Sequence, residues 1–80
     1  MKLPRDVSGR QLAHALRVFG YETTREAGSH LRLTTLRQGE HHLTIPDHKS
    51  LRVGTLAAIL SEVGAHLGIE RDALVRQLFG

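Results

Sequence analysis

A glycine, a serine and a histidine stand together where a polar stretch passes into an alternating one, and they are the strongest chemical signal in this 80-residue chain. Gly28 and Ser29 fit a tight turn, and apolar and polar residues alternate from His30 onward with the period of a strand. The two leucines of this strand should face a core, while His30 and Arg32 share the opposite face. Such a pair could place a proton-transfer group and a cation on one phosphodiester.

RNA is the substrate that suits this pair, because its own 2′-hydroxyl can act as the nucleophile. Cleavage then needs a base for the hydroxyl proton and an acid for the leaving 5′-oxygen, and imidazole suits both roles near neutral pH. His30 is the candidate catalytic residue, with Ser29 and Arg32 as candidate RNA contacts. The alternative is a surface histidine in a half-polar strand, and the sequence identifies no second acid or base.

A second basic group precedes the long C-terminal helix. His48, Lys49 and Arg52 lie in a polar, irregular segment that leads to Thr55, the expected N-cap. Free backbone N–H groups and the helix dipole at such a position favour an anion, so these three residues are candidate phosphate contacts on RNA. The alternative is a capped loop with solvated cations.

Other histidines do not indicate a metal or a cofactor. Adjacent strand residues point to opposite faces, so His41 and His42 cannot easily bind one ion together, even with His48 nearby. Neither a cysteine nor a carboxylate cluster completes such a set. His14 and His66 lie in expected helices without a partner motif. We therefore expect no metal and no cofactor.

Size and composition indicate one small basic domain spanning residues 1–80. Lys and Arg number 11 against 8 Asp and Glu, giving a net charge of +3, and six histidines add charge in acid. This balance favours an anionic partner without identifying it. Cysteine is absent, and no apolar run is long enough to span a membrane or act as a signal peptide. The expected location is cytoplasmic, without membrane attachment.

The pattern predicts an α+β fold in the order helix, three strands, helix, helix. Ser8 and Gln11 form a capping box, and Gly20 ends the first helix. The first strand is expected over Tyr21–Glu26, and the second in the alternating run that begins at Ser29. The third should follow the loop Leu36–Glu40 and stop at Pro46. A second helix should extend from its N-cap Thr55 to Gly68, and a third should span Glu70–Phe79. An antiparallel sheet with helices on one face would leave His30, Arg32, His42 and Thr44 on its open face.

Several short motifs, in one order along nearly the whole chain, resemble the HicA-type mRNA interferase toxins of bacterial and archaeal toxin–antitoxin pairs. They are Lys2-Leu3-Pro4-Arg5 with Ser8-Gly9, Phe19-Gly20-Tyr21, Gly28-Ser29-His30, Ile45-Pro46-Asp47-His48-Lys49, and Gly54-Thr55-Leu56 with Ile59-Leu60. The resemblance implies a double-stranded-RNA-binding-domain-like fold and a type II toxin that cleaves mRNA without a metal. It also implies that His30 is the catalytic histidine and that a HicB-type antitoxin covers the active surface.

Two departures and two alternatives accompany the resemblance. The family often has asparagine where this chain has Asp47, which puts an acceptor-only carboxylate beside the expected phosphate loop. The stretch after Leu60 is longer than in the shortest members, so the last helix is expected to pack differently. The alternatives to an RNase are a non-catalytic RNA-binding module and an interaction protein whose open sheet is covered by a partner.

Overall fold

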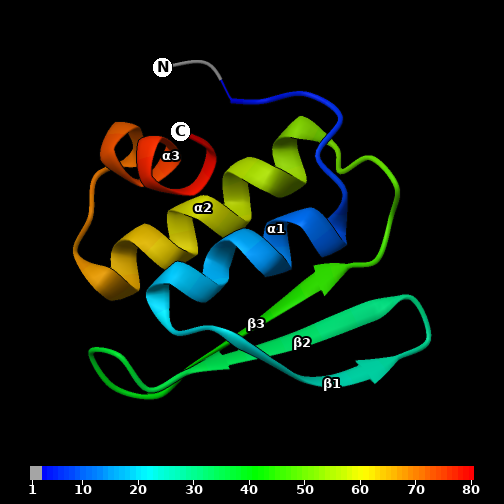
Figure 1. Ribbon diagram of the computed structural model, residues 1–80, viewed down its shortest axis with the longest axis horizontal. Coiled ribbons are helices and arrows are strands. Elements are labelled where there is room, and N and C mark those ends of the chain that lie inside the picture. The colour runs from blue at the N-terminus through cyan, green and yellow to red at the C-terminus, as the bar shows by residue number, and fades with distance from the viewer. Residues whose placement is uncertain (1–2) are drawn as a thin grey trace.

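A computed structural model describes residues 3–80 as helices packed on one face of a three-stranded sheet (Figure 1). Lys2, the first residue of the opening motif, lies outside the described residues. The elements are α1 (Gly9–Ala15), the 3-10 helix η1 (Leu16–Phe19), β1 (Glu22–Ala27), β2 (His30–Thr35), β3 (His41–Pro46), α2 (Val53–Leu67) and α3 (Arg71–Phe79). The predicted α+β order is confirmed.

The capping box at the first helix is confirmed. The Ser8 hydroxyl accepts from the Gln11 backbone N–H at 3.0 Å, and the Gln11 side-chain oxygen accepts from the Ser8 backbone N–H at 2.8 Å. The prediction of one continuous helix to Gly20 is wrong in its last turn, which tightens into η1 because Gly20 N–H donates to the carbonyl of Arg17, three residues back. Gly20 itself has φ +83° and ends the helix as expected.

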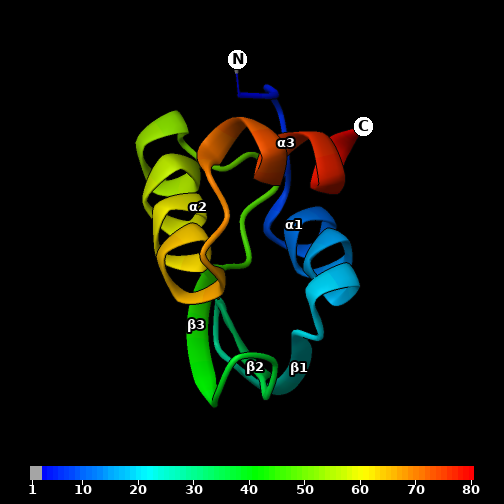
Figure 2. The ribbon, with the colours of Figure 1, turned by 90° about the vertical axis from the view of Figure 1, so that its left-hand side faces the viewer.

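The sheet is antiparallel in the order β1-β2-β3. The predicted inward residues of β2 and β3, namely Leu31, Leu33, Leu43 and Ile45, are at most 3% exposed. They pack beneath the helices, whereas no element of the described residues 3–80 covers the opposite face of the sheet (Figure 2). β1 begins and ends one residue later than predicted, because the Tyr21 N–H donates to the Leu16 carbonyl at 3.3 Å and Tyr21 therefore still belongs to the end of the preceding helical segment.

The long helix begins three residues earlier than predicted, because its N-cap is Arg52 and not Thr55. Arg52 has extended backbone angles and is the N-cap, although its side chain makes no capping hydrogen bond. The hydroxyl of Thr55 therefore lies inside the first turn, where the backbone is already helical. The predicted end at Gly68, with φ +70°, is confirmed.

The last helix packs on α2, on the side of the helical layer that faces away from the sheet (Figures 1 and 2). Glu70 is its N-cap, and the Glu70 carboxylate accepts from the Ala73 backbone N–H at 3.2 Å. Leu74 and Val75 are buried. Within residues 3–80, no helix is both long and apolar enough to cross a membrane.

Candidate active site

A bulge in β1 brings an arginine to the open face of the sheet. Thr23 pairs with the buried Leu33, but Arg25 pairs with Arg32, so the register shifts by one residue between Thr23 and Arg25. Regular alternation would put both β1 residues on the same face. Because the bulge adds Thr24, Arg25 lies on the open face with Arg32.

His30 lies at one end of a shallow hollow on this face. The hollow has a volume of about 200 Å³ and is lined by Arg25, Ala27, His30, Arg32 and Thr44, all of them exposed. His30 pairs across the strands with Ala27 on β1, and Arg32 pairs with Thr44 on β3. The predicted grouping of His30, Arg32 and Thr44 is therefore confirmed, with Arg25 as an addition. His42 lies on the same face but outside the hollow.

The two arginines of the hollow have like charges at directly opposed positions, an arrangement that destabilises a sheet. Neither the Arg25 nor the Arg32 guanidinium has a hydrogen-bond or ion-pair partner among residues 3–80. An anion bound between them would relieve this repulsion and use their fixed donors. The hollow thus combines an exposed imidazole with an uncompensated cationic pair.

The turn before His30 contacts the loop between β3 and α2. The Ser29 carbonyl accepts from the Asp47 backbone N–H at 2.7 Å, and the His48 carbonyl accepts from Gly9 N–H at 2.9 Å. The turn between β1 and β2 and the loop between β3 and α2 thus meet at the end of the molecule where α1 and α2 begin (Figure 1). Lys49 and Arg52 are exposed farther along the loop and do not line the hollow.

An arginine that the sequence did not single out connects three segments beside the turn. The Arg10 Nη2 atom lies 2.8 Å from a Glu26 carboxylate oxygen and 3.0 Å from Oδ2 of Asp47. Its hydrogen bonds to Glu26, and then to Asp47, raise the already high pKa of Arg10. The Asp47 carboxylate, expected to oppose anions at the loop, is therefore paired with a cation from α1.

The two adjacent histidines of β3 point to opposite faces, as predicted. His41 turns to the helical layer, where its Nδ1 atom lies 2.8 Å from the Tyr21 hydroxyl and its ring stacks on His66 at 4.4 Å. Burial, and then the nearby His66, lower the pKa of His41, while burial raises the pKa of Tyr21 to about 12. No three His, Cys, Asp or Glu side chains in the described chain gather as a possible metal site.

Fold and site together define a small α+β domain with a basic, histidine-bearing open sheet face. The family model of the HicA toxin of bacterial toxin-antitoxin matches residues 9–65, which is more than half of the chain. The chain therefore belongs to the HicA toxin family. The match ends within α2, so α3 lies beyond it. Comparisons with curated proteins and with solved structures found no match.

Proposed function

We propose that this protein is a metal-independent endoribonuclease that cleaves mRNA, with His30 as its general acid or base. The observation that carries the proposal is the position of His30 in one hollow with Arg25 and Arg32, whose charges are unpaired within residues 3–80. Membership of a toxin family supports a harmful activity toward the cell that makes it. An open face also suits a polymer, which cannot enter a closed pocket.

In this proposal, a phosphodiester lies against the two guanidinium groups of the hollow. The RNA 2′-oxygen attacks phosphorus, the bond to the 5′-oxygen breaks, and a 2′,3′-cyclic phosphate forms. His30 either removes the 2′-hydroxyl proton or donates one to the leaving oxygen. Arg25 and Arg32 stabilise the additional negative charge that develops on the phosphoryl oxygens. Ser29 and His48 contact the RNA on the side of the turn.

The family implies an antitoxin partner, and we propose a HicB-type protein that binds over the open face. The unpaired arginines of the hollow would attract acidic groups as well as phosphate, so the inhibitor and RNA would compete for one surface. We propose a cytoplasmic location, because that is where this protein would meet both mRNA and such a partner.

The identity of the cleaved ends tests the mechanism. RNA products should carry a 2′,3′-cyclic phosphate or its hydrolysis product, cleavage should persist in excess EDTA, and an all-deoxy strand should resist, because the RNA supplies its own nucleophile. Mass spectrometry of the fragments gives the end groups. Cleavage of DNA, or dependence on a divalent ion, would contradict the mechanism. RNA binding without turnover would instead identify a non-catalytic RNA-binding module.

The loop cations should act on RNA binding and not on the chemical step. Lys49 and Arg52 are exposed beside the start of α2, so the double alanine variant should bind RNA more weakly with little sequence preference. The salt dependence of binding should flatten by about 0.7 units of log K per log salt for each RNA phosphate that the variant no longer neutralises. Fluorescence anisotropy across a salt series measures both quantities, with Arg76→Ala on α3 as the control. Unchanged affinity and slope would show that the loop is only a connection.

A further inference from the structure

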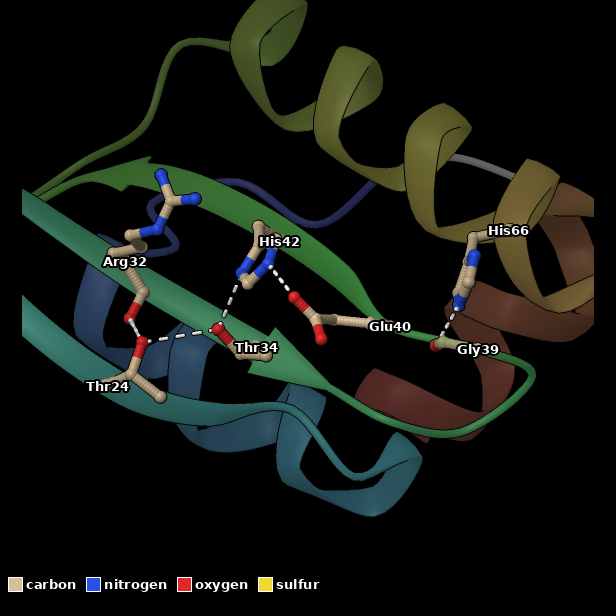
Figure 3. Close-up of polar contacts among 7 residues, drawn as sticks. All are labelled: Thr24, Arg32, Thr34, Gly39, Glu40, His42 and His66. Carbon is tan, nitrogen blue, oxygen red and sulfur yellow. Dashed lines mark hydrogen bonds and ion pairs between the residues drawn. The ribbon is translucent and has the colours of Figure 1, made fainter.

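Beyond the hollow, a continuous chain of polar side chains crosses the open face of the sheet (Figure 3). The Glu40 Oε2 atom lies 2.7 Å from Nε2 of His42, whose Nδ1 lies 2.8 Å from the Thr34 hydroxyl. The Thr34 hydroxyl oxygen lies 3.3 Å from that of Thr24, and the Thr24 hydroxyl donates its one proton to the Arg32 carbonyl at 3.3 Å. The cationic hollow does not include this chain.

The chain holds the imidazole of His42 by both of its nitrogens. An ionised carboxylate only accepts, so Nε2–H donates to Glu40, and in the neutral ring Nδ1 then accepts from the Thr34 hydroxyl. What His42 can still offer a ligand is its ring surface, and its side chain remains 37% exposed. The Glu40 side chain is 66% exposed, and its second oxygen has no partner among residues 3–80.

The loop that carries Glu40 is fixed from the helical layer. On α2, His66 Nε2–H donates to the carbonyls of Arg37 and Gly39, at 2.9 and 3.1 Å. Gln38 and Gly39 both have positive φ, +58° and +98°, so the backbone turns sharply just before Glu40 and β3. Glu40 is therefore held next to His42 before any ligand binds, which lowers the entropic cost of using it.

His42 is too far from His30 to act on the same bond. His30 pairs with Pro46 and Thr34 pairs with His42, so the two histidines are separated by four residues along the strands. Four residues of strand span about 13 Å, whereas an acid–base group must come within about 3 Å of the proton it transfers. An RNA strand lying across His30 would instead bring a neighbouring nucleotide to His42.

We propose that His42 and Glu40 form a recognition site for an RNA base that bears an amino group, within two nucleotides of the cleaved bond. This inference rests on the proposed RNase function. Unpaired RNA bases stack on histidine rings, and a carboxylate accepts a hydrogen bond from an exocyclic amino group. Uracil has no amino group, and carbonyl oxygens flank its one ring donor. The site therefore favours adenine, cytosine or guanine over uracil.

The test uses DNA strands that contain a single ribonucleotide, which defines the bond that can be cut. The bases at the two flanking nucleotides on each side are varied one at a time. For the wild-type protein, kcat/KM should fall roughly tenfold when uracil replaces an amino-bearing base at one of these positions, as expected for the loss of one hydrogen bond to a charged group. Glu40→Gln should reduce this preference to within about twofold, because an amide both donates and accepts.

The matched control is Glu62→Gln, the same change on α2, facing His41 on the helical side; it should keep the wild-type preference. Anisotropy with 2′-O-methyl oligonucleotides, which cannot be cleaved, measures the same preference as binding, and circular dichroism confirms folding of each variant. A preference that persists in Glu40→Gln, or is absent from the wild type in both assays, overturns the inference and leaves the RNase function standing. Selective binding without any cleavage supports the recognition site and refutes the RNase function.

Discussion

Replacing His30 with alanine should lower RNA cleavage at saturating RNA by about 10²- to 10⁴-fold, the usual cost of losing one general acid or base. His30 is exposed, and its side chain has no hydrogen-bond or ion-pair partner among residues 3–80, so the variant should keep its fold. Single-turnover cleavage of a labelled RNA measures the rate, and loss of growth arrest on expression is the cellular result. The KM should change much less than kcat, because Arg25 and Arg32 still hold the phosphate.

His14→Ala is the matched control, since His14 is an exposed histidine on α1 outside the hollow. This variant should cleave RNA at the wild-type rate. A folded His30→Ala protein with only a twofold loss would assign the chemistry to another group. The contrast with the Lys49 and Arg52 variant is informative, because that change should raise the RNA concentration required and leave the saturated rate unchanged.

Among the glycine-to-alanine substitutions in this protein, Gly9→Ala should be the most destabilising. A Cβ atom at Gly9 would lie 2.0 Å from the carbonyl oxygen of Pro46 and 3.2 Å from Cα of Asp47, both of them backbone atoms. The Gly9 N–H also donates to the His48 carbonyl, so α1 cannot withdraw without breaking that bond. The free energy of unfolding should fall by about 1–3 kcal/mol or more, the usual cost of overpacking.

Chemical denaturation of Gly9→Ala and Gly54→Ala compares two glycines near the starts of the two main helices. No atom of the described residues lies within 4 Å of a Cβ at Gly54, so that variant should match the wild type or gain up to about 1 kcal/mol from helix propensity. Equal stability of the two variants would show that the loop after β3, which lies over Gly9, can move to make room for a Cβ atom at little cost in free energy. Since this loop also contacts Ser29, Gly9→Ala should reduce cleavage as well.

Sequence periodicity and capping motifs predicted the features that arise within a single helix or strand. Alternation in β2 identified its buried leucines and its exposed His30, and the capping box at Ser8 located the first helix. It could not locate Arg25, because a bulge changes the face of every later residue in the strand without a sequence signal. The start of α2 also lacks a sequence signal: a side-chain cap predicts Thr55, but the helix begins after Arg52, which has extended backbone angles and makes no capping hydrogen bond with its side chain.

Contacts between segments that are distant in the sequence could not be predicted from the sequence either. Arg10, Glu26 and Asp47 come from three elements, and nothing in their spacing along the chain indicates that they meet. The chain from Glu40 to Thr24 depends on the strand register and on the loop conformation held by His66. Alternation correctly put His42 outside, yet it could not show that both of its nitrogens are already occupied.

The bulge at Thr24 also affects how readily the toxin associates with itself through the edge of its sheet once it is released from its antitoxin. All six residues of β1 are exposed, and the strand lies at an edge of the sheet, where unpaired backbone groups can recruit another chain. A bulge increases the local twist and interrupts the ladder, and the charged side chains of Glu22, Arg25 and Glu26 keep this edge hydrophilic. The distortion that directs Arg25 to the open face thus also makes this edge a poor template for aggregation.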